Sequence, residues 1–222
     1  MRGTRLGATF AIVTVDDHQT TARALFDRLK DGREVRIAGL GDSLTYGWMV
    51  RRGFFDRFCD AIEKRYVNAS LVRFNEGVPG DTAKDGLARL PAVLHRRPHL
   101  MLVQFGLNDV FSGVSVSSFA VNLTRIIEGA RQEEVAPWLV VSSPPALSHD
   151  AAAARPFYDA IRTLGEKCDI PVADLDRYWR QRCDPADPAG ALFLDDGVHP
   201  NDDGYALVAE GLLAGWDALT AA

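Results

Sequence analysis

Short apolar runs rich in β-branched residues alternate along the chain with longer stretches in which apolar residues recur every three or four positions. Uninterrupted apolar runs indicate strands that are buried on both faces, and the recurring spacing indicates amphipathic helices. The predicted strands are Phe10–Val15, Val35–Leu40, Leu71–Phe74, Leu100–Phe105, Trp138–Ser142 and Pro171–Ala173. The predicted helices are Thr21–Lys30, Phe54–Arg65, Thr82–Leu94, Ser117–Glu133, Ala151–Lys167 and Asp202–Leu219.

This alternation predicts an α/β protein with three layers, in which helices cover both faces of a parallel, doubly wound sheet. The length of 222 residues corresponds to one domain, with residues 1–34 adding a strand and a helix to its core. Ser117 and Ser118 are expected to cap their helix, and Pro91 is expected to kink or end its own. In such sheets ligands bind beyond the carboxyl ends of the strands, so functional side chains are expected just after each apolar run.

Composition and charge exclude several classes of protein. Apolar residues make up 47% and charged residues 25%, which is typical of globular proteins, and no apolar run reaches the roughly 18 residues of a membrane-spanning helix. A net charge of −5 argues against general nucleic-acid binding. The three cysteines form no Cys-x-x-Cys pair and are expected to be unreactive thiols. The apolar stretch after Arg5 lacks a small-residue cleavage site, which favours a cytoplasmic protein over a secreted one.

A candidate nucleophile follows the strand Val35–Leu40, in the segment Gly41-Asp42-Ser43-Leu44-Thr45-Tyr46-Gly47. A serine directly after a buried parallel strand lies at the ligand crevice, and the flanking glycines permit a sharp turn. One alternative is that Asp42 and Ser43 only cap a helix. Another is a phosphate-binding loop, although the Gly-Lys-Ser/Thr pattern of nucleotide hydrolases is absent.

A serine nucleophile needs a base and a group that orients the base. His199 lies in the segment Asp195-Asp196-Gly197-Val198-His199-Pro200-Asn201, and one turn can bring the Asp196 carboxylate to its imidazole and fix the tautomer. Alternatively, Asn201 caps the last helix and the segment has no further role. Asp195, Asp196 and His199 are also possible metal ligands, but no second histidine-rich segment completes a site, so no metal is expected.

The other histidines are weaker candidates. His149, in the loop after Trp138–Ser142, is a possible substrate contact, whereas His18, His95 and His99 are expected at the surface.

Two further strand ends offer donors for an oxyanion. Asn75-Glu76-Gly77-Val78-Pro79-Gly80 follows Leu71–Phe74, and the backbone N–H of Gly80 has no side chain to obstruct it. Gly106-Leu107-Asn108-Asp109 follows Leu100–Phe105, and Asn108 carries two amide donors. Each signal is weak alone, because glycine and asparagine are common in turns.

Taken together, four blocks occur in order: Gly-Asp-Ser-Leu, Asn-x-Gly-x-x-Gly, Gly-x-Asn-Asp and Asp-x-x-His-Pro. This set resembles the SGNH (GDSL) hydrolase family of esterases and lipases, from about Val35 to Trp216. The resemblance implies a flavodoxin-like α/β/α sandwich with a five-stranded parallel core and no cofactor. It also implies a serine nucleophile with a histidine base and an aspartate that orients it, here Ser43, His199 and Asp196. The implied oxyanion hole consists of the N–H groups of Ser43 and Gly80 and the side chain of Asn108.

The resemblance implies that the partner is a small-molecule ester, cleaved through an acyl-enzyme on Ser43. Acyl esters, acetyl esters and thioesters are all compatible with it. The residues expected to border the pocket are Asp42, Trp48, Val110, Phe111 and His149; the alternative for the apolar ones is packing in the core. A flavodoxin-like binder of small molecules or anions without catalysis and a metal-assisted hydrolase are the alternative functions, and nothing in the sequence indicates an oligomeric state.

Overall fold

The computed structural model describes residues 17–183 and 192–221. Five strands form one parallel sheet in the order β2-β1-β3-β4-β5. Their bounds are β1 Val35–Gly41, β2 Leu71–Gly77, β3 Leu100–Gln104, β4 Ala136–Val141 and β5 Val172–Asp174. The chain leaves β1 toward β2 and then returns past β1 to β3, so the strand order reverses between β1 and β3. In open α/β sheets such a reversal opens a crevice at the carboxyl ends of the strands.

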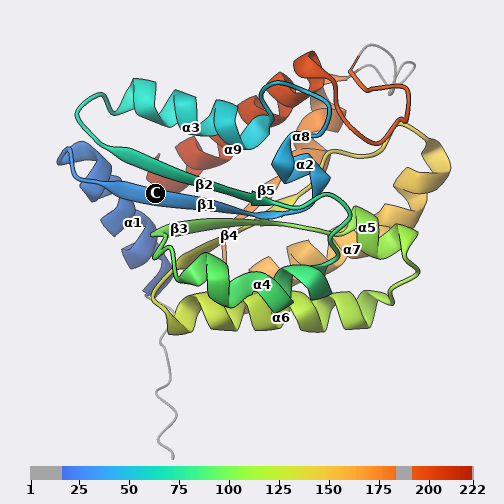
Figure 1. Cartoon of the computed structure of the whole chain (residues 1–222), viewed down its shortest axis with the longest axis horizontal. Coiled ribbons are helices and arrows are strands. Elements are labelled where there is room, and N and C mark those ends of the chain that lie inside the picture. Colours follow the sequence, from blue (N-terminus) through green and yellow to red (C-terminus); the bar gives the residue numbers. More distant parts are fainter. Residues whose placement is uncertain (1–16, 184–191, 222) are drawn as a thin grey trace, which may run out of the picture.

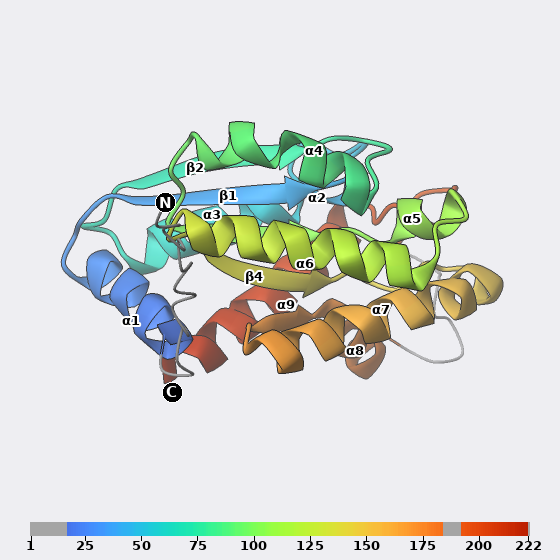
Figure 2. The ribbon, with the colours of Figure 1, turned by 90° about the horizontal axis from the view of Figure 1, so that it is seen from below.

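Helices cover both faces of this sheet. In Figure 1, α3 and α9 lie on one side of the sheet and α4, α6 and α7 on the other, and Figure 2 shows α4, α6 and α7 from below. The carboxyl ends of the strands lead into the short helices α2 and α5, whereas α1 lies near the opposite end of the sheet, where it contacts α9. The helices are α1 Asp17–Lys30, α2 Ser43–Tyr46, α3 Phe54–Arg65, α4 Ala83–Leu94, α5 Leu107–Phe111, α6 Val116–Gln132, α7 Ser148–Cys168, α8 Leu175–Arg182 and α9 Asp202–Ala221.

The core occupies both faces of the three central strands, β1, β3 and β4, whose residues are almost all buried. On one face Phe58 packs edge-on against Trp138 and Trp216, with ring centroids 5.8 and 6.1 Å away, which joins α3, β4 and α9. On the other face the rings of Phe119 and Phe157 lie 5.2 Å apart and join α6 to α7. Burial on both faces explains why these strands are continuous apolar runs.

The predicted three-layer α/β fold is confirmed, and the helix Phe54–Arg65 has the predicted bounds. Three short helices, α2, α5 and α8, were not predicted. The predicted cap of α6 is wrong. Ser115, not Ser117 or Ser118, caps the helix, and its hydroxyl accepts a 3.2 Å hydrogen bond from the Ser118 N–H. Pro91 does not stop α4, which continues to Leu94, because a proline in the last turn removes only one helical hydrogen bond.

His99 is also not the surface residue that was predicted. It is half-buried, and its Nδ1 accepts a 2.9 Å hydrogen bond from the backbone N–H of Arg36. Burial, together with the charges of Arg28 and Arg36, lowers its pKa. The predicted strand Phe10–Val15 and the side chain of His18 lie outside the described residues.

Three further features bear on function. Within residues 17–183 and 192–221, no helix has the length and apolar character needed to cross a bilayer. No cluster of three or more His, Cys, Asp or Glu side chains in this part of the chain is suited to hold a metal ion. Cys59, Cys168 and Cys183 are free thiols, and Cys59 is buried.

Candidate active site

Ser43 is the first residue of α2, directly beyond the end of β1. Asp42 caps this helix, with its Oδ1 accepting a 2.9 Å hydrogen bond from the Leu44 N–H. A Cβ atom at Gly41 would overlap the Thr45 side chain and approach the Gln104 carbonyl to 2.8 Å. Glycine at position 41 therefore allows the strand to turn directly into the helix, and the capping role of Asp42 coexists with an accessible position for Ser43.

The histidine comes from a tight turn that precedes α9. The turn closes through a 2.8 Å bond from Leu194 N–H to the His199 carbonyl, and Gly197 has a φ of 66°. His199 Nε2 lies 2.7 Å from Ser43 Oγ, across 156 residues of sequence. Asn201 caps α9 by accepting bonds from the N–H groups of Asp203 and Gly204 at 3.1 and 3.0 Å. The capping alternative is thus correct for Asn201, and it leaves the His199 imidazole free to face Ser43.

Asp196 holds the other side of the imidazole. Its Oδ2 lies 2.7 Å from His199 Nδ1, and its Oδ1 accepts 2.9 Å bonds from the N–H groups of Val198 and His199. Partial burial raises the pKa of Asp196, but these backbone bonds and the imidazole outweigh burial and lower it. An ionised carboxylate only accepts hydrogen bonds, so it places the proton of a neutral imidazole on Nδ1. Nε2 is then the acceptor that faces the Ser43 hydroxyl.

The ends of β1, β2 and β3 meet beside Ser43. Gly77 pairs with Gly41 in the sheet, and the Val78 N–H donates a 3.0 Å bond to the Gly41 carbonyl. Gly80 follows in an exposed turn with a φ of 89°, and no atom of the described residues other than its chain neighbours lies within 4 Å of the place where a Cβ would be. Asn108 lies on α5, and its Nδ2 donates a 3.0 Å bond to the Asp81 carbonyl, which leaves a second amide hydrogen for another acceptor.

A buried polar cluster beneath Ser43 was not predicted. The Gln104 side chain donates to Asp42 Oδ2 at 3.2 Å and to Ser142 Oγ at 2.9 Å, and it accepts from Thr45 Oγ1 at 2.7 Å. All four side chains are at most 2% exposed. A polar residue at the end of the apolar run Leu100–Phe105 was the signal in the sequence that could have revealed this cluster.

Four of the five predicted pocket residues are exposed or half-buried. Trp48 and Phe111 are 40% and 49% exposed, and the ring of Trp48 lies 6.4 Å from that of His199. Val110 is half-buried against the core, in agreement with the packing alternative. His149 is exposed, and its Nε2 lies 3.0 Å from Asp150.

Asp42 does not line the pocket, because it is only 1% exposed. Burial raises its pKa to about 7; the charges of Asp109 and Asp81 act in the same direction, and the bonds from the Leu44 N–H and Gln104 oppose them. Asp42 therefore supports α2 from below and does not meet a substrate.

Most of the exposed large apolar side chains lie on the short helices and loops at this edge of the sheet. The loop of Leu147 lies against the histidine turn, since the Ala146 N–H donates a 2.7 Å bond to the Gly197 carbonyl. The rings of Tyr46 and Trp48 are 6.4 Å apart. These side chains, which we call the apolar rim, are Tyr46, Trp48, Met49, Val78, Phe111 and Leu147.

A parallel α/β sheet that carries a serine, an imidazole and a carboxylate in one hydrogen-bonded chain at its carboxyl edge has the architecture of a serine hydrolase. A sequence model of the GDSL-like lipase/acylhydrolase family matches residues 40–207, and the chain belongs to this family. The resemblance predicted from the four sequence blocks is confirmed. The protein is accordingly a serine hydrolase that cleaves carboxylic esters. The alternative of a small-molecule binder without catalysis is therefore excluded.

Relatives and solved structures agree with this assignment. Thioesterase 1/protease 1/lysophospholipase L1 of Escherichia coli K12 is 27% identical over 179 residues, which cover 77% of this chain and 78% of the relative. An arylesterase of Vibrio mimicus is 25% identical over 179 residues, which cover 79% and 84%. The structure of Axe2, an acetylxylan esterase of Geobacillus stearothermophilus, shares the fold with a TM-score of 0.73 at 16% identity, and the match covers 82% of this chain and 94% of Axe2.

Proposed function

We propose that Ser43, His199 and Asp196 form the catalytic triad of this ester hydrolase. The observation that carries the proposal is the continuous chain of 2.7 Å contacts from Ser43 Oγ to His199 Nε2 and from His199 Nδ1 to Asp196 Oδ2. The N–H groups of Ser43 and Gly80 and the amide of Asn108 form the oxyanion hole. Ser43, Gly80 and Asn108 follow the ends of β1, β2 and β3 of one sheet, and the turn that carries His199 bonds to Ser43, which supports a single catalytic domain.

Acylation begins when Ser43 Oγ attacks the carbonyl carbon of the ester while His199 Nε2 takes the hydroxyl proton. The negative charge on the former carbonyl oxygen is held by the oxyanion hole, and the Asp196 carboxylate stabilises the imidazolium. The tetrahedral species collapses when the bond to the alcohol oxygen breaks, and His199 gives its proton to that oxygen. The alcohol leaves and the acyl group remains on Ser43.

Deacylation repeats these steps with water. His199 Nε2 takes a proton from the water as its oxygen attacks the acyl carbon, and the same donors hold the oxyanion. Collapse breaks the bond to Ser43 Oγ, which recovers its proton from His199. The carboxylic acid is released, and the enzyme returns to its starting state.

The substrate that the site supports best is a small neutral ester with an apolar acyl group. Trp48 of the apolar rim lies beside His199, and Phe111 of the rim is exposed at the end of α5, so these two side chains offer a surface for the acyl chain. The relatives are named as a thioesterase/lysophospholipase and an arylesterase. These names support leaving groups that include thiols, alcohols and phenols. A series of p-nitrophenyl esters from acetate to decanoate tests this: kcat/KM should increase with chain length, and Phe111→Ala should remove part of that increase. A series in which acetate is the best substrate contradicts an apolar acyl site.

The triad is tested by replacement and by labelling. Ser43→Ala should abolish hydrolysis of p-nitrophenyl butyrate, and a fluorophosphonate should label the parent protein at Ser43 but not this variant. Ser117→Ala, an exposed serine on α6, is the matched control and should retain both activity and labelling. Full activity in Ser43→Ala would refute the proposed mechanism.

A further inference from the structure

Arg89, on α4, binds two separate segments of the site. Its Nε donates a 2.6 Å hydrogen bond to Asp81 Oδ2, and its Nη2 donates a 2.8 Å bond to the Gly41 carbonyl. Gly41 lies two residues before Ser43, and Asp81 directly follows Gly80. The Asp81 carbonyl in turn accepts the bond from Asn108. The Arg89 guanidinium is thus bonded within two residues of Ser43 and to the neighbour of Gly80, and through Asp81 it is linked to Asn108.

Packing contributes little to the position of Gly80. The residue is exposed, and within the described part of the chain only its two sequence neighbours can come within 4 Å of the place where its Cβ would be. The turn is held by backbone bonds, from Val78 N–H to the Gly41 carbonyl and from Asp81 N–H to the Val78 carbonyl, and by the side-chain bonds to Asp81. The side chains of Arg89 and Asp81 are only 22% and 15% exposed, so their charge-assisted bond is weakly screened by solvent.

We propose that Arg89 is a positioning residue of the oxyanion hole, which rests on the proposed function above. Its guanidinium holds the turn that carries Gly80, and through Asp81 the amide of Asn108, at a fixed place relative to the backbone N–H of Ser43. The planar fork of an arginine reaches Asp81 and the Gly41 carbonyl at once, whereas the single ammonium of a lysine satisfies one partner well at a time.

A positioning role predicts a particular kinetic effect. Oxyanion donors act only when they lie at hydrogen-bond distance from the developing charge, and a displacement of about 1 Å can cost about 100-fold in rate. Arg89→Met should therefore lower kcat about 10- to 100-fold. KM should change less than about threefold, because the donors interact more strongly with the oxyanion than with the uncharged ester.

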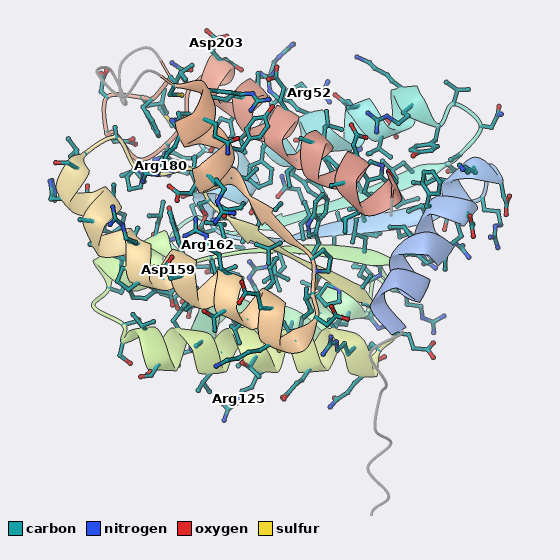
Figure 3. The ribbon with its side chains drawn as sticks, turned by 180° about the vertical axis from the view of Figure 1, so that it is seen from behind. Arg52, Arg125, Asp159, Arg162, Arg180 and Asp203 are labelled. Carbon is teal, nitrogen blue, oxygen red and sulfur yellow. The ribbon has the colours of Figure 1, made fainter. Side chains whose placement is uncertain are left out.

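Arg162 offers a matched control whose bonding partners, Asp159, Asp174 and Asp176, belong neither to the triad nor to the oxyanion turn. Its side chain is also 22% exposed, and it bonds to Asp174 and Asp176 at 2.8 to 2.9 Å. Figure 3 shows Arg162 on α7 near Asp159, with Arg180 on the neighbouring α8. Arg162→Met removes a comparable arginine–carboxylate arrangement without touching the oxyanion turn, so kcat of this variant should stay within about twofold of the parent value.

The experiment measures kcat and KM for p-nitrophenyl butyrate, the pH profile of kcat/KM and the inhibition constant of butylboronic acid. A boronic acid forms a tetrahedral adduct with the serine hydroxyl, and this adduct uses the oxyanion donors. In Arg89→Met its inhibition constant should rise by about the same factor as kcat falls, while the midpoint of the pH profile stays unchanged because His199 and Asp196 are intact. Methylguanidinium, which replaces the missing guanidinium group, should restore part of the activity of Arg89→Ala. It should not restore the activity of Asn108→Ala.

Several results would overturn the proposal: kcat of Arg89→Met within twofold of the parent, a raised KM with unchanged kcat, or an equal loss of kcat in Arg162→Met. If Arg89→Met fails to fold, Arg89→Lys provides the test, and its kcat should fall about 3- to 10-fold, since one of two bonds is kept; an unchanged kcat there also overturns the proposal. Ser43→Ala in the same series separates the two hypotheses. Activity in Ser43→Ala refutes the triad, whereas an inactive Ser43→Ala beside a fully active Arg89→Met refutes only the role of Arg89.

Discussion

Replacing Asp42 with asparagine should change how the stability of the protein depends on pH. Asp42 is buried beneath Ser43, and burial raises its pKa to about 7 from an ordinary value of 3.8. The negative charges of Asp109 and Asp81 raise it further, and the hydrogen bonds from Leu44 and Gln104 only partly compensate. An asparagine at this position does not ionise, so it removes this titration from the folded and the unfolded chain alike.

The sign follows from proton binding. Between pH 3.8 and about 7 the folded protein holds the Asp42 proton and the unfolded chain has lost it, so the free energy of unfolding decreases as the pH rises. One pKa unit is equivalent to about 1.4 kcal/mol, so the whole range corresponds to a loss of about 4 kcal/mol. About 3 kcal/mol of this loss falls between pH 5 and pH 8, where the protein is convenient to study. Between pH 5 and pH 8, the free energy of unfolding of Asp42→Asn should therefore rise by about 3 kcal/mol relative to that of the parent protein.

The surroundings of Asp42 can accept an amide. The Gln104 amide can rotate by 180°, because its other neighbours, Thr45 and Ser142, are hydroxyls that either donate or accept. A change in the free energy of unfolding that is the same at every pH does not affect the test, because the prediction concerns only how the difference between the two proteins varies with pH. Urea unfolding of both proteins at pH 5, 6, 7 and 8 measures this change. A difference between the two proteins that stays constant within about 1 kcal/mol would refute the assignment of a neutral carboxyl beneath the nucleophile.

Three further predictions concern the oxyanion hole, the base and a cluster of ion pairs. Asn108→Ala should lower kcat about 10²- to 10³-fold with the fold intact, as measured by steady-state hydrolysis and circular dichroism. The ratio kcat/KM should fall in acid, because only a neutral His199 can accept the Ser43 proton, while the lowered pKa of Asp196 keeps that carboxylate ionised; a profile that stays flat into acid contradicts this role. Arg162→Met should cost about 2 kcal/mol in thermal or urea unfolding, since it removes the cation shared by two largely buried carboxylates, Asp174 and Asp176, and leaves them only the more exposed Arg177 and Arg180.

The regular helices and central strands were predictable because burial repeats along them. In α3, Phe54, Phe58 and Ile62 lie four residues apart on one buried face, and the predicted bounds are those observed. The helices α2 and α5 have four and five residues, so no period can repeat within them. Strand β2 lies at the sheet edge and is half-exposed, so its end at Gly77 follows from pairing with Gly41 and not from its own pattern.

The residue types of the site were predictable from the four blocks, and many of their partners were not. The position of a residue in a periodic pattern indicates whether it is buried, but it does not indicate what it meets across the fold. Arg89 reaches Gly41 over 48 residues of sequence, and the Arg36 N–H reaches the His99 imidazole over 63. Long polar side chains on a helix are usually exposed, so the sequence pattern of α4 contains no signal for the contacts of Arg89.

The environment, and not the sequence neighbourhood, decides which carboxyl serves the histidine. Asp42 is adjacent to Ser43 in the chain, yet it is surrounded by Leu44 and Gln104 and its pKa is raised to about 7. Asp196 is 153 positions away, yet backbone N–H groups lower its pKa and it lies 2.7 Å from His199. Two carboxyls whose pKa values are driven apart are suited to different tasks. A carboxyl with a pKa of about 7 is only partly ionised near that pH, whereas the lowered pKa of Asp196 keeps that carboxylate ionised. Asp196 is therefore the group that can orient His199 and stabilise its imidazolium, and Asp42 acts on catalysis only through the position of α2.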